Sequence, residues 1–347
     1  MQLLESKIVV SDLRVCLIAC AFKGTGYIKI NIRNQALNVA SLQLEICDMK
    51  QKNIICKEKN QKVAYLFLTP ALIILTVFVF IPLISAFVIS LTDIDIYMQD
   101  FSFVKLGNYI KLFKDERVLN ATLNTLSFTI IEVPLQIILA LLLLMFMSKN
   151  NRFHKLLRTV FYLPYVCSMT AISIMWSMLI NTNYGILPYY LSKIGIELPN
   201  LLSSTTWAMP TVIFVSVWKG FGYTLTILSA AALGIPSTTY EAAEIDGASG
   251  VQKFWYVTIP GIKHTIGFCV VTTLILALQV FDQIYVMTDG GPQYKTETLV
   301  GYIYNRGFQT APFDLGYASA VAVYLFIIII IITFAMKKYT FGQGEDE

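Results

Sequence analysis

The sequence is poor in charged residues. Only 14% of its 347 residues are Asp, Glu, Lys or Arg, while 56% are hydrophobic. A soluble domain carries about a quarter charged residues, so a soluble globular fold is excluded. The net charge of +4 is too small to define a partner. This composition predicts an all-α integral membrane protein with several membrane-spanning helices.

Other absences exclude whole classes of function. The chain has two histidines, His154 and His264, and six cysteines, none in a CxxC pair, so we expect no metal site and no cofactor. No basic stripe interleaved with aromatic residues indicates nucleic acid. No GxxxxGK[ST] motif is present to hold ATP phosphates, and no Ser/His/Asp arrangement is recognisable. We therefore predict that the chain is not an enzyme.

Long apolar runs are what the sequence has in abundance. A membrane-spanning helix needs roughly 20 mostly apolar residues, and six segments satisfy this. We expect the prolines in or beside them, 70, 82, 134 and 164, to kink the helices without breaking them, because neighbouring helices satisfy the freed backbone groups. The six predicted spans are Ala64–Leu91, Leu123–Met147, Val160–Ile180, Trp207–Leu233, Thr265–Met287 and Tyr317–Met336.

The distribution of Lys and Arg predicts the orientation. Cytoplasmic loops are enriched in these residues. They gather before the first predicted span, between the second and third, and after the last. Both termini are therefore expected in the cytoplasm, together with residues 234–264 and a tail at 337–347. The residues concerned are Lys50, Lys52, Lys57, Lys59, Lys62, Lys149, Arg152, Lys155, Arg158, Lys337 and Lys338.

The N-terminal region differs from the rest. Residues 1–48 mix charged and apolar residues without a clear period and contain no span. Met49 is followed by a basic segment, 49–63, and then by the predicted membrane domain, 64–336. Our hypothesis is that translation starts at Met49. The alternative is a short cytoplasmic extension.

A polar segment between the fourth and fifth predicted spans has its own helical pattern. Ser237 can cap a helix that begins near Thr238, with Glu241 and Glu244 in its early turns near the positive end of the helix dipole. Gly247 permits a sharp bend. Pro260 predicts the end of a second short helix. We predict two short helices joined at the glycine.

This segment resembles the cytoplasmic coupling loop, or EAA loop, of ABC-importer permeases. That loop has Glu-Ala-Ala, three residues, Gly, nine residues, and a hydrophobic-x-hydrophobic-Pro ending, which corresponds here to Glu241-Ala242-Ala243, Gly247 and Val257-Thr258-Ile259-Pro260. The resemblance implies that the segment contacts an ATPase subunit, with Glu241 pairing to a basic residue. An amphipathic helix on the membrane surface is the alternative. The implied coupling residues are Glu241, Ala242, Ala243, Asp246, Gly247, Ala248 and Pro260.

The resemblance covers nearly all of the chain after Met49. Asn124-Thr125-Leu126 and Gly290-Gly291-Pro292 are similar to segments of the carbohydrate-uptake permeases, in particular the short six-span members. It implies a type I ABC importer permease fold in a bacterial plasma membrane, surrounded by lipid. The implied substrate is a sugar or a related solute such as glycerol 3-phosphate. The implied partners are a second homologous permease in a heterodimer, two ATP-binding subunits and an extracytoplasmic solute-binding protein.

Substrate contacts are expected, by the same analogy, near the middle of the spans that flank the coupling segment. A sugar site needs an aromatic face together with hydroxyl or amide groups. Thr273, Leu276 and Gln279 recur at helical spacing and can share a face. Polar contacts between helices are an equally open interpretation. The candidates are Gly220, Tyr223, Thr273, Leu276, Gln279 and Phe281.

Two acidic residues keep other transport mechanisms open. Glu132 lies in the middle of the second predicted span, and Asp282 lies near the outer end of the fifth. An acidic residue within the membrane is a candidate ion-coupling group. An ion-coupled secondary transporter is therefore one alternative, and an ABC permease for a non-sugar solute is another.

Overall fold

The computed structural model describes residues 65–97, 102–147 and 152–341, with side chains described as far as Met336. Predictions for residues 1–48, 49–63 and 342–347, including the translation start, lie outside the described residues. Contacts divide the chain into two units, Met1–Thr76 and Val77–Glu347. Every described residue of the first unit, 65–76, is exposed and belongs to a helix. Apart from Tyr65–Ile89, which extends over both units, the helices below belong to the second unit.

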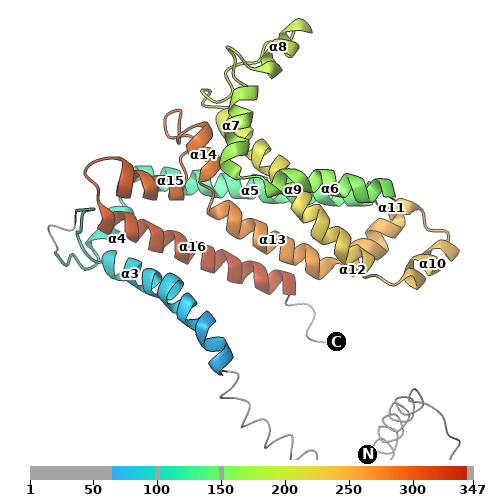
Figure 1. The fold of residues 1–347 in the computed structure, drawn as a ribbon, viewed down its shortest axis with the longest axis horizontal. Helices are drawn as coiled ribbons and strands as arrows, with labels where there is room; N and C mark the ends of the chain where they lie inside the picture. The colour runs from blue at the N-terminus through green and yellow to red at the C-terminus, as the bar shows by residue number, and fades with distance from the viewer. Residues whose placement is uncertain (1–64, 98–101, 148–151, 342–347) are drawn as a thin grey trace, which may run out of the picture. The chain divides into compact units, whose positions relative to one another are not determined.

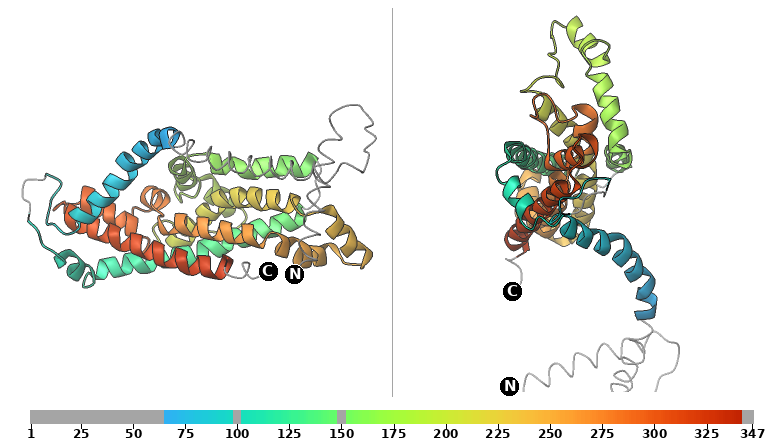
Figure 2. Two further views of the ribbon diagram at one scale, coloured as in Figure 1. Left: turned by 90° about the horizontal axis from the view of Figure 1, so that it is seen from below. Right: turned by 90° about the vertical axis from the view of Figure 1, so that its left-hand side faces the viewer.

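Three long helices of the second unit are uninterrupted. They are α5 (Glu116–Phe146), α9 (Ala208–Leu233) and α16 (Leu315–Phe341), and they run lengthwise beside α6 and α13 (Figures 1 and 2). With Tyr65–Ile89 they give four helices long and apolar enough to cross a membrane, or six if each of two bent helix pairs forms one span. Within the described residues, extended pairing is limited to isolated bridges, Thr92 with Phe103 and Asp95 with Asp314. The predicted all-α membrane fold is confirmed.

The third predicted span is broken rather than kinked. Its residues form α6 (Arg152–Val166) and α7 (Met169–Leu179), which meet at an angle of 96°. Pro164 lies inside α6, two residues before its end. The expectation of a continuous span over Val160–Ile180 is therefore wrong, because α7 turns away after Val166 (Figure 1). By contrast, Pro134 remains inside the uninterrupted α5.

The fifth predicted span is also interrupted. Its main helix, α13 (Lys263–Leu278), ends before Gln279, and α14 (Asp282–Met287) begins after a short non-helical segment. Phe281 in that segment has φ −144° and ψ −62°, outside the helical region. The continuous span expected over Thr265–Met287 is therefore divided. Shorter helices occur elsewhere in the second unit. They are α3 (Ile81–Ile89), α4 (Gly107–Leu112), α8 (Ile186–Lys193) and α15 (Leu299–Tyr304).

Close packing of α9 against α5 and α6 forms the centre of the helix bundle. A Cβ atom at Gly222 would lie 1.9 Å from the carbonyl oxygen of Phe161, and one at Gly220 would lie 2.3 Å from Oε1 of Gln136. Gln136 Nε2 also donates a hydrogen bond of 2.9 Å to Thr224 Oγ1. These two glycines therefore let helix backbones approach closely, as small residues do in membrane bundles.

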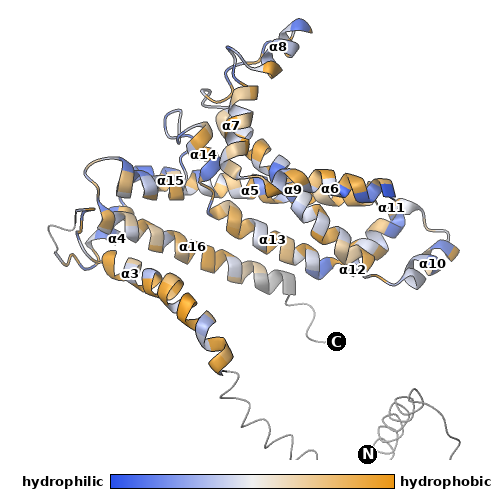
Figure 3. Ribbon diagram, in the orientation of Figure 1, coloured by the Kyte–Doolittle hydropathy of each residue, from blue (hydrophilic) through white to orange (hydrophobic). Residues whose placement is uncertain are grey.

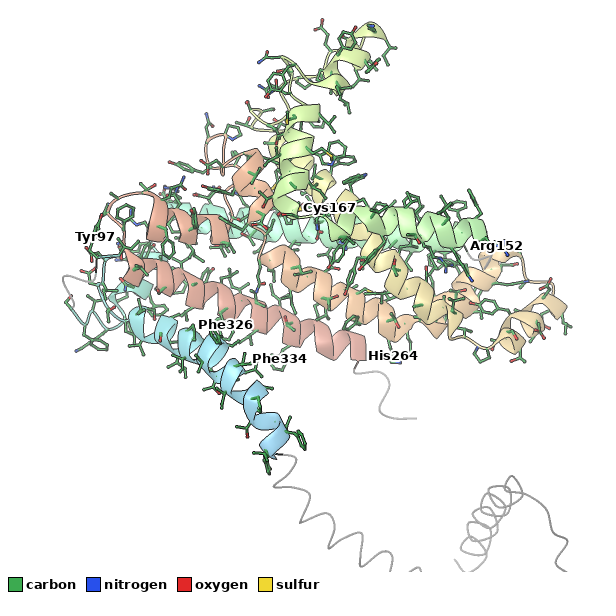
Figure 4. The ribbon with its side chains drawn as sticks, in the orientation of Figure 1. Tyr97, Arg152, Cys167, His264, Phe326 and Phe334 are labelled. Atoms are coloured by element: carbon green, nitrogen blue, oxygen red, sulfur yellow. The ribbon has the colours of Figure 1, made fainter. Side chains whose placement is uncertain are left out.

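Apolar side chains also cover the outside of the helices. Ile130 on α5 is 69% exposed and Phe334 on α16 is 68% exposed, and both helices are predominantly hydrophobic along their length (Figure 3). Phe326 meets Phe87 of α3 edge-on at a ring-centroid distance of 5.9 Å (Figure 4). Exposed apolar surface of this extent suits a lipid environment.

Candidate functional site

The polar segment begins with α10 (Ser237–Ile245). Pro236 is its N-cap residue and no side chain caps it, so the expected capping by Ser237 is wrong by one position. No acidic residue lies in its first turn. Glu241 and Glu244 therefore do not stabilise the positive end of the helix dipole, contrary to expectation. Both residues lie further along the helix, with exposed side chains. The charge of Glu241 is therefore accessible to another molecule.

The end of α10 explains the spacing from the alanine pair to the glycine. Asp246 is the C-cap residue, and Gly247 follows with φ +76°. The Gly247 N–H donates to the Glu244 carbonyl at 3.0 Å, and the Ala248 N–H donates to the Ala243 carbonyl at 2.9 Å. This pair of bonds is a Schellman motif, which favours glycine at the left-handed position. Gly247 thus ends α10 and sets the bend.

A second capping device starts the next helix. Ser249 caps α11 (Gly250–Lys253): its hydroxyl accepts from the Gln252 N–H, and the Gln252 side chain accepts from the Ser249 N–H. The helix continues through η3 (Phe254–Thr258) and α12 (Ile259–Gly261). The two arms are connected by an ion pair of 3.0 Å between Lys253 and Glu244. The segment is therefore a preformed helical hairpin rather than a loose loop.

The break before α13 lies after Pro260 rather than at it. Pro260 occupies the first turn of α12, which ends at Gly261, and Ile262 separates α12 from α13. The two helical stretches meet at 71°. A Cβ at Gly261 would lie 2.6 Å from Cδ1 of Ile235. The predicted boundary is thus displaced by two residues, because proline is compatible with the first turn of a helix.

The tip of the hairpin presents apolar and acidic side chains together. Ile245 is 87% exposed and Val251 is 54% exposed. Glu241, Ala242 and Asp246 are also exposed, whereas Ala243 and Ala248 are half-buried. Helices α10 and α11 are much more polar than α5 or α16 (Figure 3). An isolated exposed isoleucine is unremarkable, but this one stands on a rigid, polar tip suited to a protein partner.

Behind the hairpin lies a cavity of about 390 Å³, between it and the ends of α5, α6 and α9. Arg158 lines it and donates from Nη2 to the Met147 carbonyl at 3.0 Å, at the C-terminal end of α5. Tyr240 lines it as well, and its hydroxyl lies 3.0 Å from Thr258 Oγ1. The Arg158 bond thus joins α6 to the end of α5, and the Tyr240 contact joins the two arms of the hairpin.

The substrate candidates on α9 have defined neighbours. Tyr223 stacks on Tyr165 of α6, with ring centroids 4.4 Å apart and planes at 13°. Gly220 lies against Gln136, so its missing side chain is needed for packing of α9 on α5. Both α9 candidates are half-buried. Because Tyr165 lies next to the last residue of α6, Tyr223 lies beside the break between α6 and α7, which the labelled Cys167 marks (Figure 4).

The candidates on α13 and after it do not share one environment. Thr273 is buried, whereas Leu276 is 59% exposed and Gln279 is exposed beyond the last helical residue. Phe281 stacks on Tyr285 at 5.3 Å and contacts Tyr304 at 5.2 Å. The structure thus places Leu276 and Gln279 on accessible surface, separates them from Thr273, and puts Phe281 in an aromatic cluster.

The two acidic residues within or beside spans differ in burial. Glu132 on α5 is 6% exposed, and its Oε2 atom accepts no hydrogen bond from the described residues. Asp282 is exposed at the start of α14. No group of three or more His, Cys, Asp or Glu residues that could hold a metal ion occurs within the described residues.

At the other end of the bundle, a charged cluster joins α5 to the segment after α14. Arg117 donates to both carboxylate oxygens of Glu297, at 2.8 and 2.7 Å. The Glu297 side chain is 5% exposed and that of Arg117 is 32% exposed. The Arg117 guanidinium also lies 4.0 Å from the centre of the Tyr294 ring. Sequence reasoning missed this cluster because its partners are 180 residues apart.

Two sequence motifs meet beside this ion pair. Asn124 of α5 donates to the carbonyl oxygens of Tyr294 and Glu297, at 2.8 and 3.0 Å. Thr125 Oγ1 accepts from the Leu299 N–H at 3.0 Å. The segment that they hold follows Gly290-Gly291-Pro292, where Gly290 has φ +77°. The Asn-Thr pair and the Gly-Gly-Pro turn therefore belong to one structural unit.

Asp115, just before α5, anchors the same end of the bundle. Its Oδ1 accepts from the Arg117 N–H at 2.9 Å, and its Oδ2 accepts from the hydroxyls of Tyr302 and Tyr317 at 2.7 and 2.8 Å. Burial by itself would raise the pKa of Asp115. The hydrogen bonds from the two tyrosines and from the backbone outweigh burial, so its pKa lies below the usual 3.8.

Comparison with known proteins gives a consistent result. The family profile described as "Binding-protein-dependent transport system inner membrane component" matches residues 106–340. The lactose transport system permease protein LacF of Rhizobium radiobacter is 34% identical, with 78% of this chain and 91% of LacF covered. The sn-glycerol-3-phosphate transport system permease protein UgpA of Agrobacterium fabrum is 32% identical, with 82% and 98% covered.

Solved structures show the same likeness. A bacterial ABC transporter that imports the acidic polysaccharide alginate has a chain that superposes with a TM-score of 0.71 at 25% identity, with 83% of this chain and 98% of that chain covered. A second structure of the alginate transporter, in complex with an alginate pentasaccharide-bound periplasmic protein, gives a TM-score of 0.69 at 25% identity, with 80% and 94% covered.

Proposed function

Because the chain belongs to the family of binding-protein-dependent transport system inner membrane components, we propose that it carries a sugar or related solute across the bacterial plasma membrane by ATP-driven alternating access. The lactose and glycerol 3-phosphate permeases among its relatives support this substrate class. The chain is a transport subunit, and the energy for transport comes from separate ATPase subunits.

The observation that carries this proposal is the preformed polar hairpin at 237–261. Two helices are fixed relative to one another by the Schellman motif at Gly247, the capping box at Ser249 and the Lys253–Glu244 ion pair. Its tip exposes Glu241 and Ile245. A rigid element that continues into α13 can transmit motion of an ATPase to the membrane helices. Glu241, Ala242, Ala243, Asp246, Gly247, Ala248 and Pro260 remain our proposed coupling residues.

The proposed assembly has this chain beside a second, homologous permease. One ATPase subunit binds each coupling hairpin in the cytoplasm, and a solute-binding protein delivers substrate on the opposite side. The alginate importer bound to its periplasmic protein supports the last of these partners. The basic residues that flank the spans support cytoplasmic termini. We retain Gly220, Tyr223, Thr273, Leu276, Gln279 and Phe281 as proposed substrate contacts.

The test begins with the purified assembly. The tagged chain is extracted from its native membranes in mild detergent, and the proteins that co-purify are identified by mass spectrometry. The expected partners are an ATPase and a second permease. ATP hydrolysis is then measured in proteoliposomes with and without the co-purified solute-binding protein. A chain that elutes without an ATPase contradicts the proposal.

The role of the hairpin is tested with Glu241→Lys and Gly247→Pro. Both variants are expected to insert in the membrane but to lose stimulation of ATP hydrolysis by the binding protein. Glu197→Lys provides the matched control, because it makes the same charge change at an exposed position between α8 and α9. Normal stimulation in both hairpin variants would show that the hairpin does not couple.

Ion coupling was the alternative transport mechanism. The family of this chain favours an ATP-driven importer, and Glu132 is the buried one of the two acidic residues considered for ion coupling. We therefore expect Glu132→Gln to keep ATP-dependent uptake. Uptake that continues without ATP in the presence of an ion gradient would instead support a secondary transporter.

A further inference from the structure

Lys219 is a cation near the middle of a membrane span. It belongs to α9 (Ala208–Leu233), and its side chain is half-buried. Among the residues that the structure describes, no carboxylate forms an ion pair with its Nζ atom. A charged residue within a membrane span is costly and is usually paired or functional. Lys219 is therefore a candidate functional residue of this span.

The surroundings of Lys219 are aromatic. Its Nζ atom lies 4.9 Å from the centre of the Tyr165 ring. Tyr165 in turn stacks on Tyr223 at 4.4 Å and contacts Tyr162 at 5.8 Å. All three tyrosines are half-buried. A cation beside aromatic rings offers one group for an oxyanion and several faces or edges for a sugar ring.

Interrupted helices meet at this position. Helix α6 ends at Val166 and α7 starts at Met169, and the labelled Cys167 marks the break (Figure 4). The second interruption, between α13 and α14, lies close to α9 as well, because Gln283 Nε2 donates to Ser216 Oγ of α9 at 3.1 Å. Substrate sites of membrane transporters commonly lie where interrupted helices meet near the middle of the membrane.

We propose that Lys219 makes this permease selective for an anionic carbohydrate, a sugar that carries a carboxylate or a phosphate. This inference rests on the proposed function and adds the charge of the substrate to it. Lys219 contacts the anion directly, while Tyr165 and Tyr223 position the ring. Asp282 is adjacent to Gln283, whose side chain contacts α9, so a negative charge at Asp282 would oppose binding of the same anion.

A structural role for Lys219 makes a different prediction. Its Nζ atom lies 3.2 Å from the carbonyl oxygen of Tyr165, near the C-terminal end of α6, where a cation is favourable. If this bond is its whole role, removing the charge weakens the protein without changing which solutes bind. If Asp282 is its counter-ion, Asp282→Asn and Lys219→Gln have similar effects.

The test uses the complete transporter, purified with its partner permease and ATPases in lipid nanodiscs. Binding is measured by equilibrium dialysis for two matched pairs of probes: galacturonate against its methyl ester, and glucose 6-phosphate against glucose. The wild type is expected to favour the anionic member of at least one pair. The pair that shows the preference distinguishes a carboxylate from a phosphate.

Variants then assign the preference to Lys219. Lys219→Gln is expected to weaken binding of the anion by at least about tenfold, the loss typical when one member of a direct charge pair is removed, and to leave neutral probes unchanged. Lys219→Arg should retain the preference. Asp282→Asn should strengthen it. Lys193→Gln is the matched control, because Lys193 lies 4.5 Å from the Tyr189 ring but on α8, outside the spans.

The inference is overturned if neither anionic probe binds better than its neutral counterpart, or if Lys219→Gln keeps the preference. Equal effects of Lys219→Gln and Asp282→Asn would also overturn it, in favour of a structural ion pair. Failure of the proposed function is distinguishable, since in that case no ATPase co-purifies with the chain whatever residue occupies position 219.

Discussion

The coupling hairpin and the Arg117–Glu297 cluster hold their segments together in opposite ways. The hairpin relies on backbone hydrogen bonds and caps between residues three to five positions apart, and its one ion pair, between residues nine positions apart, includes a carboxylate that is 74% exposed. In the cluster, a carboxylate that is 5% exposed pairs with an arginine from a helix 180 residues away. One region is stable locally, and the other depends on the whole bundle.

This difference suits the function proposed for the hairpin and indicates a structural role for the cluster. A segment that contacts a moving ATPase must keep its own shape while its position changes, and local caps achieve this. The cluster joins α5 to the segment before α15, two elements distant in sequence. Because buried ion pairs depend on accurate geometry, we expect it to keep these elements together during transport.

The largest predicted effect is on the cluster. Glu297→Ala leaves Arg117 without its carboxylate and should lower the free energy of unfolding by about 3 kcal/mol, the low end for a broken buried pair because Arg117 is partly exposed. Thermal unfolding in detergent measures it. Replacing both residues, Arg117→Met with Glu297→Leu, should recover part of the loss. A double variant that is less stable than Glu297→Ala would show that the pair is not the cause.

The next effect concerns the bend in the hairpin. Gly247 has φ +76°, and an alanine there costs roughly 1–2 kcal/mol. Gly247→Ala should increase hydrogen exchange in residues 237–261 and leave global unfolding almost unchanged. Gly250→Ala is the control, because Gly250 begins α11 without a positive φ and a Cβ there meets no atom within 4 Å. Equal exchange in the two variants would contradict a local role for Gly247.

The same contrast explains what the sequence could predict. The hairpin was predictable, apart from its exact boundaries at Ser237 and Pro260, because caps and turns depend on neighbouring residues. The long apolar spans were predictable from composition. The breaks after Val166 and Leu278 were not, since no proline or glycine lies between the two helices at either position. The Arg117–Glu297 pair and the Tyr165–Tyr223 stack require tertiary contacts that no local pattern specifies.

Acid should lower the stability of the end of the bundle that holds Asp115. The folded state lowers the pKa of Asp115 below 3.8, so its ionised form contributes stability above that pH. This contribution is lost as the pH falls through the lower, folded pKa. When the free energy of unfolding is measured from pH 5 to pH 2, it should therefore fall more steeply for the wild type than for Asp115→Asn. Identical slopes would mean that the tyrosine hydrogen bonds do not favour the ionised carboxylate.

The smallest effect is expected for the ion pair of the hairpin. The Lys253–Glu244 pair is a single contact of 3.0 Å to an exposed carboxylate, whereas Arg117 contacts both oxygens of the buried Glu297. A double-mutant cycle with Lys253→Ala and Glu244→Ala, measured by hydrogen exchange of residues 237–261, should give less than about 1 kcal/mol, as for other exposed pairs. The value should also fall as salt is added. A coupling energy as large as that of the cluster would show that burial does not distinguish the two regions, and that the hairpin depends on its charges as much as on its caps.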